Sequence, residues 1–442
     1  MAADLSAGKT SAVELANESL ASAERTHPTL KSFITLAESD AREQARRSDD
    51  RRRALRTRSL LDGIPYGAKD LFQTRGIRTT AGSKVLHDWV PDVSASVIQQ
   101  LETAGAVLIG KTNLHEFAYG ATGENDWAGT VVNPHDTQRL AGGSSSGSAA
   151  AVAAGIVPFA LGTDTGGSAR VPAALCGTAG FKPSMGRISL EGAVPFCWSL
   201  DHAGILARTA DDLAIVAACL GVGSAEPIAN HLSTQPLRVG IVPTWSERSD
   251  RSVRRGFEAA QRILTDQGAT LTEVVLPDQA EARTVSLTIQ LAEALTYHGP
   301  HLRREKESFG PDILSGFVLG QFLSAESYIQ CKRLTVEYQR VFRSYFEEVD
   351  ILLTPACPVT APMVGAVNAQ VGADTMPVGN ALTLFTSFFN LVGAPAVVLR
   401  AGVDDHGLPV GVQIIGDLNN DARTLAVALL LERNGLGSIK PN

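Results

Sequence analysis

The sequence has no apolar segment long enough to cross a membrane and no cysteine motif typical of a disulfide framework or a metal site. The longest apolar run, residues 149–161, is too short to span a bilayer and is interrupted by Gly155. The N-terminus lacks the positive and then apolar pattern of a secretory signal. The cysteines are odd in number, lie far apart and form no CxxC pair: Cys176, Cys197, Cys219, Cys331 and Cys357. We therefore expect a soluble cytoplasmic protein with reduced thiols and no membrane contact.

A strong excess of charge of one sign is also missing. The formal net charge of the 442 residues is −7, and the one conspicuous basic cluster, residues 46–58, is interrupted by Asp49 and Asp50. We interpret this cluster as a solvated helix end and loop in preference to a nucleic-acid-binding patch. Charged residues make up 19% of the chain and no low-complexity tract occurs, so extensive disorder is not expected.

Hydrophobic residues make up 44% of the chain, enough for a large buried core. Their spacing predicts helices over 10–25, 38–55, 147–154, 209–220 and 250–267. The first helix has Thr10 or Ser11 as a cap, with Glu14 placed for a capping box. Residues 281–347 are predicted to be mostly helical, with breaks at Pro300 and Pro311. Strands are predicted near 63–72, 106–110, 156–162, 237–242, 274–276, 351–354, 396–400 and 410–415.

This alternation of helices and strands predicts an α/β fold with a mixed, mostly parallel central sheet covered by helices on both sides. No clear linker divides the chain, so we expect a single large domain over residues 1–442. Its parts are a helical N-terminal segment to about residue 60, a Gly/Ser-rich core over about 61–210 and a variable, largely helical region over about 245–390.

Residues 141–182 differ from the rest of the chain because they combine glycine, alanine and serine with apolar runs and almost no charge. Linkers are also rich in glycine and serine, but they are polar. Within this segment the loop GTDTGGS, residues 162–168, joins a predicted strand to a predicted helix. The N–H groups of Thr165, Gly166, Gly167 and Ser168 can converge there as an oxyanion hole. A tight structural turn or a phosphate-binding loop at a helix start fits the same residues.

A second loop, GGSSSG at residues 142–147, contains Ser144. A nucleophilic serine needs a proton acceptor, and neither loop contains a histidine. The remaining candidates are a second serine that relays the proton and a lysine that accepts it. Lys69, at the end of an apolar strand, fits the role of this lysine. Burial would lower its pKa toward that of a useful base. An ion pair of Lys69 with Asp70 or another carboxylate is the simpler interpretation of the lysine taken alone.

Three segments together carry a family resemblance: GIPYGAKD at 63–70, GGSSSGSAAAVAAG at 142–155 and LGTDTGGSARVPA at 161–173. In this order they make the sequence similar to the amidase-signature family. Further segments extend the resemblance over nearly the whole chain: KTNLHEFAYG at 111–120, NPHD at 133–136, GFKPSMGRIS at 180–189, SLDHAGILART at 199–209, DILLTPACP at 350–358, FNLVGAPA at 389–396 and GLPVGVQIIG at 407–416.

The resemblance implies roles for the catalytic residues. Ser168 is expected to be the acylating nucleophile, and Lys69 the general base and acid. Ser144, after a cis peptide bond from Gly143, is expected to pass protons between them. Ser145, Asp164 and Arg170 match positions that hold the two loops together, and the loop formed by Tyr119, Gly120, Ala121 and Thr122 is expected to contact the acyl part of the substrate.

No metal and no cofactor are expected. His115 and Glu116 begin a possible HExxH motif, but Tyr119 stands where the second histidine is required. The GKT at residues 8–10 lacks the upstream glycine of a phosphate-binding P-loop.

The function that follows is the hydrolysis of a small, mainly neutral carboxamide by a monomer or homodimer. A carbamate (urethane) or ester hydrolase using the same three residues is the first alternative. The glutaminase subunit of a tRNA-dependent amidotransferase, which works with partner proteins, is the second. A binding protein without activity is disfavoured because all three catalytic positions are present.

Overall fold

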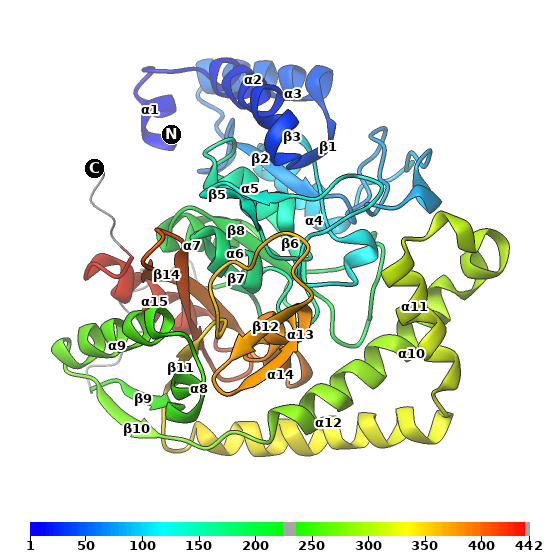
Figure 1. The fold of residues 1–442 in the computed structure, drawn as a ribbon. Coiled ribbons are helices and arrows are strands. Elements are labelled where there is room, and N and C mark those ends of the chain that lie inside the picture. The colour runs from blue at the N-terminus through cyan, green and yellow to red at the C-terminus, as the bar shows by residue number, and fades with distance from the viewer. Residues whose placement is uncertain (224–235, 438–442) are drawn as a thin grey trace.

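An eleven-stranded mixed sheet forms the centre of the computed structural model, which describes residues 1–223 and 236–437 (Figure 1). Its strands are β1 (Phe33–Leu36), β2 (Pro65–Lys69), β3 (Val107–Thr112), β6 (Phe159–Asp164), β7 (Ala179–Lys182), β8 (His202–Ala207), β9 (Arg238–Ile241), β10 (Thr270–Glu273), β11 (Ile351–Pro355), β14 (Ala396–Val403) and β15 (Pro409–Ile415). Their order is β1-β3-β2-β6-β8-β7-β14-β15-β11-β9-β10. Two small hairpins lie outside it, β4 (Val132–Asn133) with β5 (Asp136–Leu140) and β12 (Asn368–Val371) with β13 (Asp374–Pro377).

The polarity of this sheet corrects one part of the prediction. The sheet is mixed as expected, but it is not mostly parallel. Among the described strands, the parallel neighbours are β2 with β3, β2 with β6, β9 with β10 and β9 with β11. Every other pair is antiparallel, including the run from β6 through β8, β7, β14 and β15 to β11. Antiparallel neighbours need only short connections, such as the turn between β14 and β15, and no helical crossover.

Helices cover the sheet in two groups. α5 (Ser146–Ala153) and α6 (Arg170–Cys176) contact each other and the central strands, whereas α7 (Ala210–Cys219), α9 (Arg251–Asp266) and α15 (Asp421–Arg433) form a second contacting group. The N-terminal part adds α1 (Ala2–Ser6), α2 (Ala12–Leu30), α3 (Glu38–Arg53) and α4 (Ser96–Ala104). The later part adds α8 (Pro243–Glu247), α10 (Gln279–Glu305), α11 (Pro311–Leu319), α12 (Ala325–Tyr345), α13 (Val378–Thr383) and α14 (Ser387–Leu391). The long helices α10 and α12 lie along one side of the molecule (Figure 1).

Most predicted elements are confirmed. Ser11 caps α2 in a complete capping box with Glu14, and the hydroxyl of Thr209 caps α7. Two predictions are wrong. The strand predicted at 274–276 is β10, which ends at Glu273 because its parallel partner β9 fixes its register. The break predicted at Pro300 does not occur, since α10 continues through this proline while packing against α11 and α12.

The small residues of the Gly/Ser-rich core allow α5 to lie very close to the sheet. A side-chain carbon added at Gly147 would lie 2.3 Å from the carbonyl oxygen of Ser32, and one at Gly162 would lie 2.8 Å from the hydroxyl of Ser145. Only glycine fits at such approaches. This close packing brings the loop before α5 against the end of β6.

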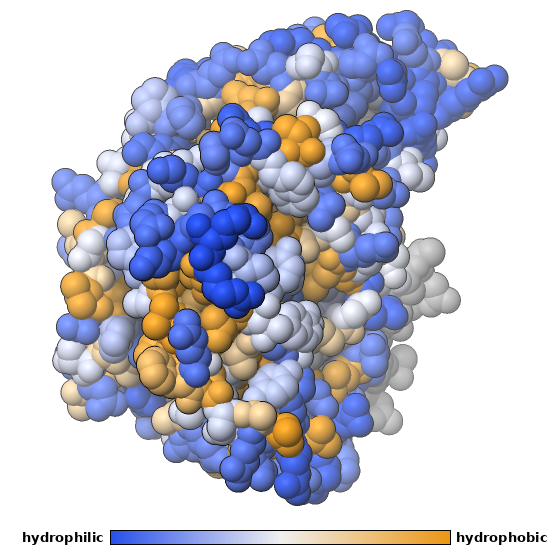
Figure 2. Space-filling model, turned by 90° about the vertical axis from the view of Figure 1, so that its right-hand side faces the viewer, coloured by the Kyte–Doolittle hydropathy of each residue, from blue (hydrophilic) through white to orange (hydrophobic). Residues whose placement is uncertain are grey.

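The face shown in Figure 2 is mainly hydrophilic in its upper part, whereas hydrophobic residues are exposed between polar ones in its middle and lower left. Among the hydrophobic side chains exposed on α11 and just after it are Val318, Leu319 and Phe322. Within residues 1–223 and 236–437, no helix combines the length and the hydropathy that crossing a membrane requires.

Candidate active site

Two strand ends meet beside the start of α5. β2 ends at Lys69 and its parallel neighbour β6 ends at Asp164, so both carboxyl ends open at the same edge of the sheet. The loop from Thr165 to Ala169, called the serine loop below, follows β6, leads into α6 and carries Ser168. The loop before α5 carries Ser144, and the peptide bond between Gly143 and Ser144 is cis.

Lys69 is completely buried and faces two hydroxyl groups. Its Nζ lies 2.7 Å from Ser144 Oγ and 2.7 Å from Thr163 Oγ1. Burial lowers the pKa of Lys69 to about 7, although the negative charges of Asp201 and Asp164 act in the opposite direction. The amine is therefore divided between its neutral and charged forms near neutral pH.

The alternative that Lys69 serves an ion pair with Asp70 does not hold. The carboxylate of Asp70 lies 2.9 Å from Nζ of Lys111 and accepts hydrogen bonds from the backbone and the hydroxyl of Thr80. Asp70 thus has its own buried partner, and Lys69 is left facing Ser144 and Thr163.

Among the described residues, the N–H groups of Thr165, Gly166 and Ser168 have no hydrogen-bond acceptor, and all three residues line a cavity. The N–H of Gly167 differs, since it donates to Asp164 Oδ1 at 2.9 Å. The same carboxylate accepts the N–H groups of Ala169 and Arg170 at the start of α6. Asp164 thereby engages the N–H groups at the start of α6, and three of the four predicted oxyanion donors remain free.

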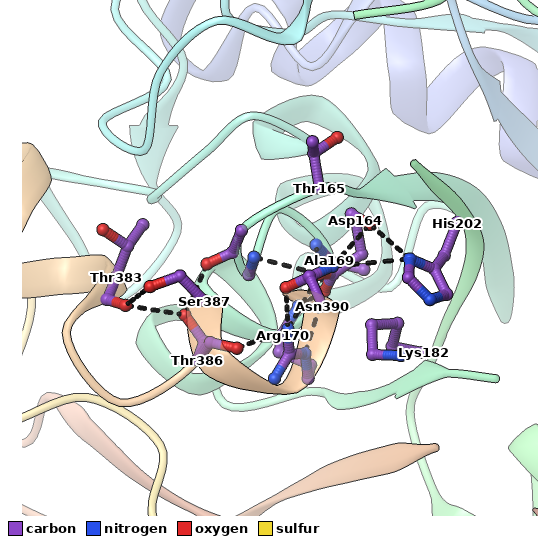
Figure 3. A network of polar contacts seen from close by, with 12 residues as sticks. Asp164, Thr165, Ala169, Arg170, Lys182, His202, Thr383, Thr386, Ser387 and Asn390 are labelled. Carbon is purple, nitrogen blue, oxygen red and sulfur yellow. Dashed lines mark hydrogen bonds and ion pairs between the residues drawn. The ribbon is translucent and has the colours of Figure 1, made fainter. Parts of the chain in front are cut away.

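Asp164 and Arg170 form a completely buried ion pair that ties four segments together (Figure 3). Two parallel hydrogen bonds of 3.0 and 2.9 Å join the guanidinium to the carboxylate. Burial alone would raise the pKa of Asp164, but the charge of Arg170 and its hydrogen bonds hold it well below the usual range. Arg170 also donates to the side chains of Asn390 and Gln413 and to the carbonyl of Thr386. The pair thus fixes the serine loop against the C-terminal part of the sheet.

Ser145 joins the two loops directly. Its N–H donates to the carbonyl oxygen of Ser168, while its hydroxyl donates to the carbonyl of Thr163 and accepts the N–H of that residue. No hydrogen bond joins the hydroxyls of Ser144 and Ser168 within the described part of the chain. Contacts of this kind often tighten only when substrate is bound.

Ser168 opens onto a cavity of about 200 Å³. The cavity wall includes Tyr119, Gly120 and Ala121 from the predicted substrate loop. Thr122 points elsewhere, with its hydroxyl 3.3 Å from Nδ1 of His115. The remaining wall comes mainly from α10, α13 and the start of α14: Arg283, Ser286, Leu287, Gln290, Gly379, Asn380, Thr383 and Ser387.

Two polar residues near Lys69 and the serine loop were not singled out from the sequence. Thr163 is the second partner of Lys69. Asp201 accepts the hydroxyl of Thr165 at 2.5 Å and two backbone N–H groups, and burial raises its pKa to about 6. Both lie inside segments that carry the family resemblance, which was the only signal for them.

His115 and Glu116 serve structural contacts. His115 Nε2 lies 2.9 Å from Asp312, and Glu116 accepts the hydroxyl of Ser83 and the N–H of Gly310. These bonds tie the loop before Tyr119 to α11. Within residues 1–223 and 236–437, no three His, Cys, Asp or Glu side chains gather as metal ligands would.

Known proteins resemble this chain over nearly its whole length. The family model described as Amidase matches residues 14–425. A glutamyl-tRNA(Gln) amidotransferase subunit of Chloroflexus aggregans is 38% identical, over 97% of this chain and 94% of that protein. AtzE, a 1-carboxybiuret hydrolase subunit of Pseudomonas sp. (strain ADP), is 36% identical, over 99% and 98%. A solved structure from a vestigial protein complex, connected with the origins of an s-triazine catabolic enzyme, has a TM-score of 0.93 and 33% identity, over 99% of this chain and 98% of that one.

Proposed function

This chain belongs to the amidase family and is an amide-hydrolysing enzyme, and we propose that it cleaves a small carboxamide through an acyl-enzyme on Ser168. In this proposal Lys69 is the base and Ser144 the relay. The oxyanion donors are the N–H groups of Thr165, Gly166 and Ser168.

The reaction begins with neutral Lys69. Its lone pair takes the proton of the Ser144 hydroxyl, to which it lies 2.7 Å away, while one of its N–H bonds is directed to Thr163. Ser144 takes the proton of Ser168, whose oxygen then attacks the amide carbon. The negative oxygen that forms is stabilised by the free N–H groups of the loop.

Collapse of this intermediate breaks the C–N bond. Lys69, now protonated, returns the proton through Ser144 to the departing nitrogen, so that a neutral amine or ammonia leaves. Water then attacks the acyl-Ser168 ester in the same way, with Lys69 again accepting and returning one proton. The net change is one water consumed, with one carboxylic acid and one amine released.

The single observation that carries this proposal is the contact between Lys69 and Ser144. A buried lysine with a pKa of about 7, placed 2.7 Å from a hydroxyl and with no carboxylate of the described residues in contact, has the properties of a base and not those of an ion-pair partner. His202 offers no comparable arrangement, because its Nδ1 faces the backbone carbonyls of Asp164 and Leu200 and burial holds its pKa well below the usual range.

Two further candidates have specific support. A carbamate or ester hydrolase needs no other residues, because the same acyl-enzyme chemistry opens those bonds. A glutaminase subunit is favoured by the 38% identity to the amidotransferase subunit of Chloroflexus aggregans. A glutaminase subunit needs a partner, so activity of the purified chain alone on a chromogenic anilide favours a stand-alone amidase. Activity only in the presence of partner proteins and L-glutamine favours the glutaminase subunit.

The decisive experiment screens amides, carbamates and esters with the purified chain and traps the acyl group by mass spectrometry. A fluorophosphonate is expected to label Ser168. Ser387 is a matched internal control, because it lines the same cavity but donates its hydroxyl to the carbonyl of Thr383. Labelling of Ser387 without Ser168, or turnover without an acyl-Ser168, would contradict the proposal.

A further inference from the structure

Helix α10 presents a polar stripe to the cavity. Arg283, Ser286, Leu287 and Gln290 all line it, and their spacing of three, four and seven residues places them on one helix face. Gln290 lies next to the serine loop, since its Nε2 is 3.8 Å from the position of a side-chain carbon built on Gly166. Arg283 stands two turns earlier, about 10 Å farther along the helix axis. The stripe therefore runs from the reacting serine to a guanidinium.

Arg283 has no carboxylate partner among the described residues. Its guanidinium donates to the hydroxyl of Thr383 at 2.9 Å and to the side-chain oxygen of Asn380, and both acceptors are neutral. An arginine has five N–H donors, so these two contacts leave donors free on a side chain that faces the cavity. Burial also lowers the pKa of the Arg283 guanidinium, a sign that its charge is only weakly compensated by its surroundings.

The three acidic residues of α10 are engaged elsewhere, and Glu305 at its end pairs with Arg304. Glu281 is exposed and lies against Tyr338. Glu293 accepts the hydroxyls of Ser199 and Tyr328 on another side of the helix. Half-buried charges without a counter-ion are costly in a protein, and a bound anion would offset that cost.

We propose that Arg283 is a specificity-determining residue that binds a carboxylate at the far end of the substrate's acyl chain, an inference that rests on the proposed function of Ser168. The substrate is then a short acid amide with a carboxylate at one end and the scissile amide at the other. Arg283 would bind the carboxylate, and Ser286 and Gln290 would lie beside the chain between. This revises the expectation of a mainly neutral substrate, because the sequence alone does not show that α10 brings a cation to the cavity.

The test uses the acid products of such a reaction as ligands. Fluorophosphonate labelling of Ser168 is followed in the presence of succinate, glutarate or adipate, and in the presence of butanoate, pentanoate or hexanoate. Each pair has the same chain length and differs by one terminal carboxylate. In the wild type we expect at least one dicarboxylate to protect Ser168 on the order of 100-fold better than its monocarboxylate, the range of effects seen when a buried charge pair loses one member.

In Arg283→Gln this ratio is expected to fall to near one, and in Arg283→Lys to keep an intermediate value, because lysine retains the charge without the planar donors. Arg255→Gln is the matched control, since Arg255 is an exposed arginine on α9 paired with Asp405. It should keep the wild-type ratio.

Equal protection by both acids of every pair, including no protection by either, would overturn the inference, as would a preference that survives Arg283→Gln. The failure of the underlying proposal has a different signature, namely the absence of fluorophosphonate labelling at Ser168 in the wild type without any acid added.

Discussion

The proposed base predicts the pH dependence of kcat/KM. Only neutral Lys69 can accept a proton, and burial places its pKa at about 7, below the value of a free lysine. The rate should therefore rise with pH through about 7 and level off on the alkaline side. One unit below that pKa roughly a tenth of the lysine is neutral, so kcat/KM at pH 6 should be about a tenth of its plateau value.

Asp201 changes the shape of this limb in a predictable direction. Its negative charge raises the pKa of Lys69, so Asp201→Asn should lower that pKa and move the limb to lower pH. In the wild type Asp201 has a pKa of about 6, so it becomes neutral in the same range. Lys69 then loses the charge that favours its protonated form, and the fall below pH 6 should be shallower than tenfold per unit.

The assay is the initial rate at low substrate concentration from pH 5 to pH 9, since kcat/KM reports ionisations of the free enzyme. Circular dichroism of each variant at each pH controls for unfolding. A single acidic limb near pH 6.5 that survives in the residual activity of Lys69→Ala would assign the limb to a histidine and refute the reasoning. A limb unmoved by Asp201→Asn would refute the electrostatic part alone.

Four further predictions concern the same centre. Ser168→Ala should abolish turnover while leaving the unfolding transition unchanged; a variant that keeps more than a few per cent of the rate would remove Ser168 from its role. Lys69→Ala and Ser144→Ala should each lose several orders of magnitude in kcat and their combination little more, because groups acting as one proton-transfer unit are not additive; additive losses in the steady-state rates would contradict the relay. Arg170→Met leaves the carboxylate of Asp164 buried and unpaired, so urea denaturation should show a loss of about 3–5 kcal/mol, and an unchanged midpoint would contradict this expectation. Chelators should leave the rate unchanged, and inhibition reversed by added zinc would point to a metal.

Local rules account for the elements that the sequence predicts well. The hydroxyl of Ser11 and the carboxylate of Glu14 are three residues apart, so the cap of α2 could be identified without any tertiary information. The polarity of the sheet, in contrast, does not follow from local rules. Whether β8 lies parallel or antiparallel to β6 depends on how the chain returns between them, and no periodicity records that path.

The candidate site also has one part that the sequence predicts and one part that depends on the tertiary structure. The positions of Ser144, Ser168 and Lys69 follow from segments with an unusual composition and a family resemblance. Arg283 lies in an ordinary amphipathic helix, where an arginine is normally assigned to solvent. Its place in the cavity depends on contacts with Asn380 and Thr383, which lie about a hundred residues away in the sequence. Val275 is the opposite of Arg283: it is an apolar residue for which burial is expected, but it lies beyond the end of β10 and is 85% exposed.

The cavity is built from two kinds of wall that respond differently to mutation. The wall that carries Ser168 depends, like the buried Lys69, on the register of β2 and β6, where one inserted residue would turn every side chain to the opposite face. The wall formed by α10 obeys helical spacing instead, and residues 283, 286, 287 and 290 can be exchanged without moving a strand. A combinatorial library confined to these four positions would therefore vary substrate choice while the reacting groups stay in place, and α10 is the element on which engineering of new amide substrates should begin.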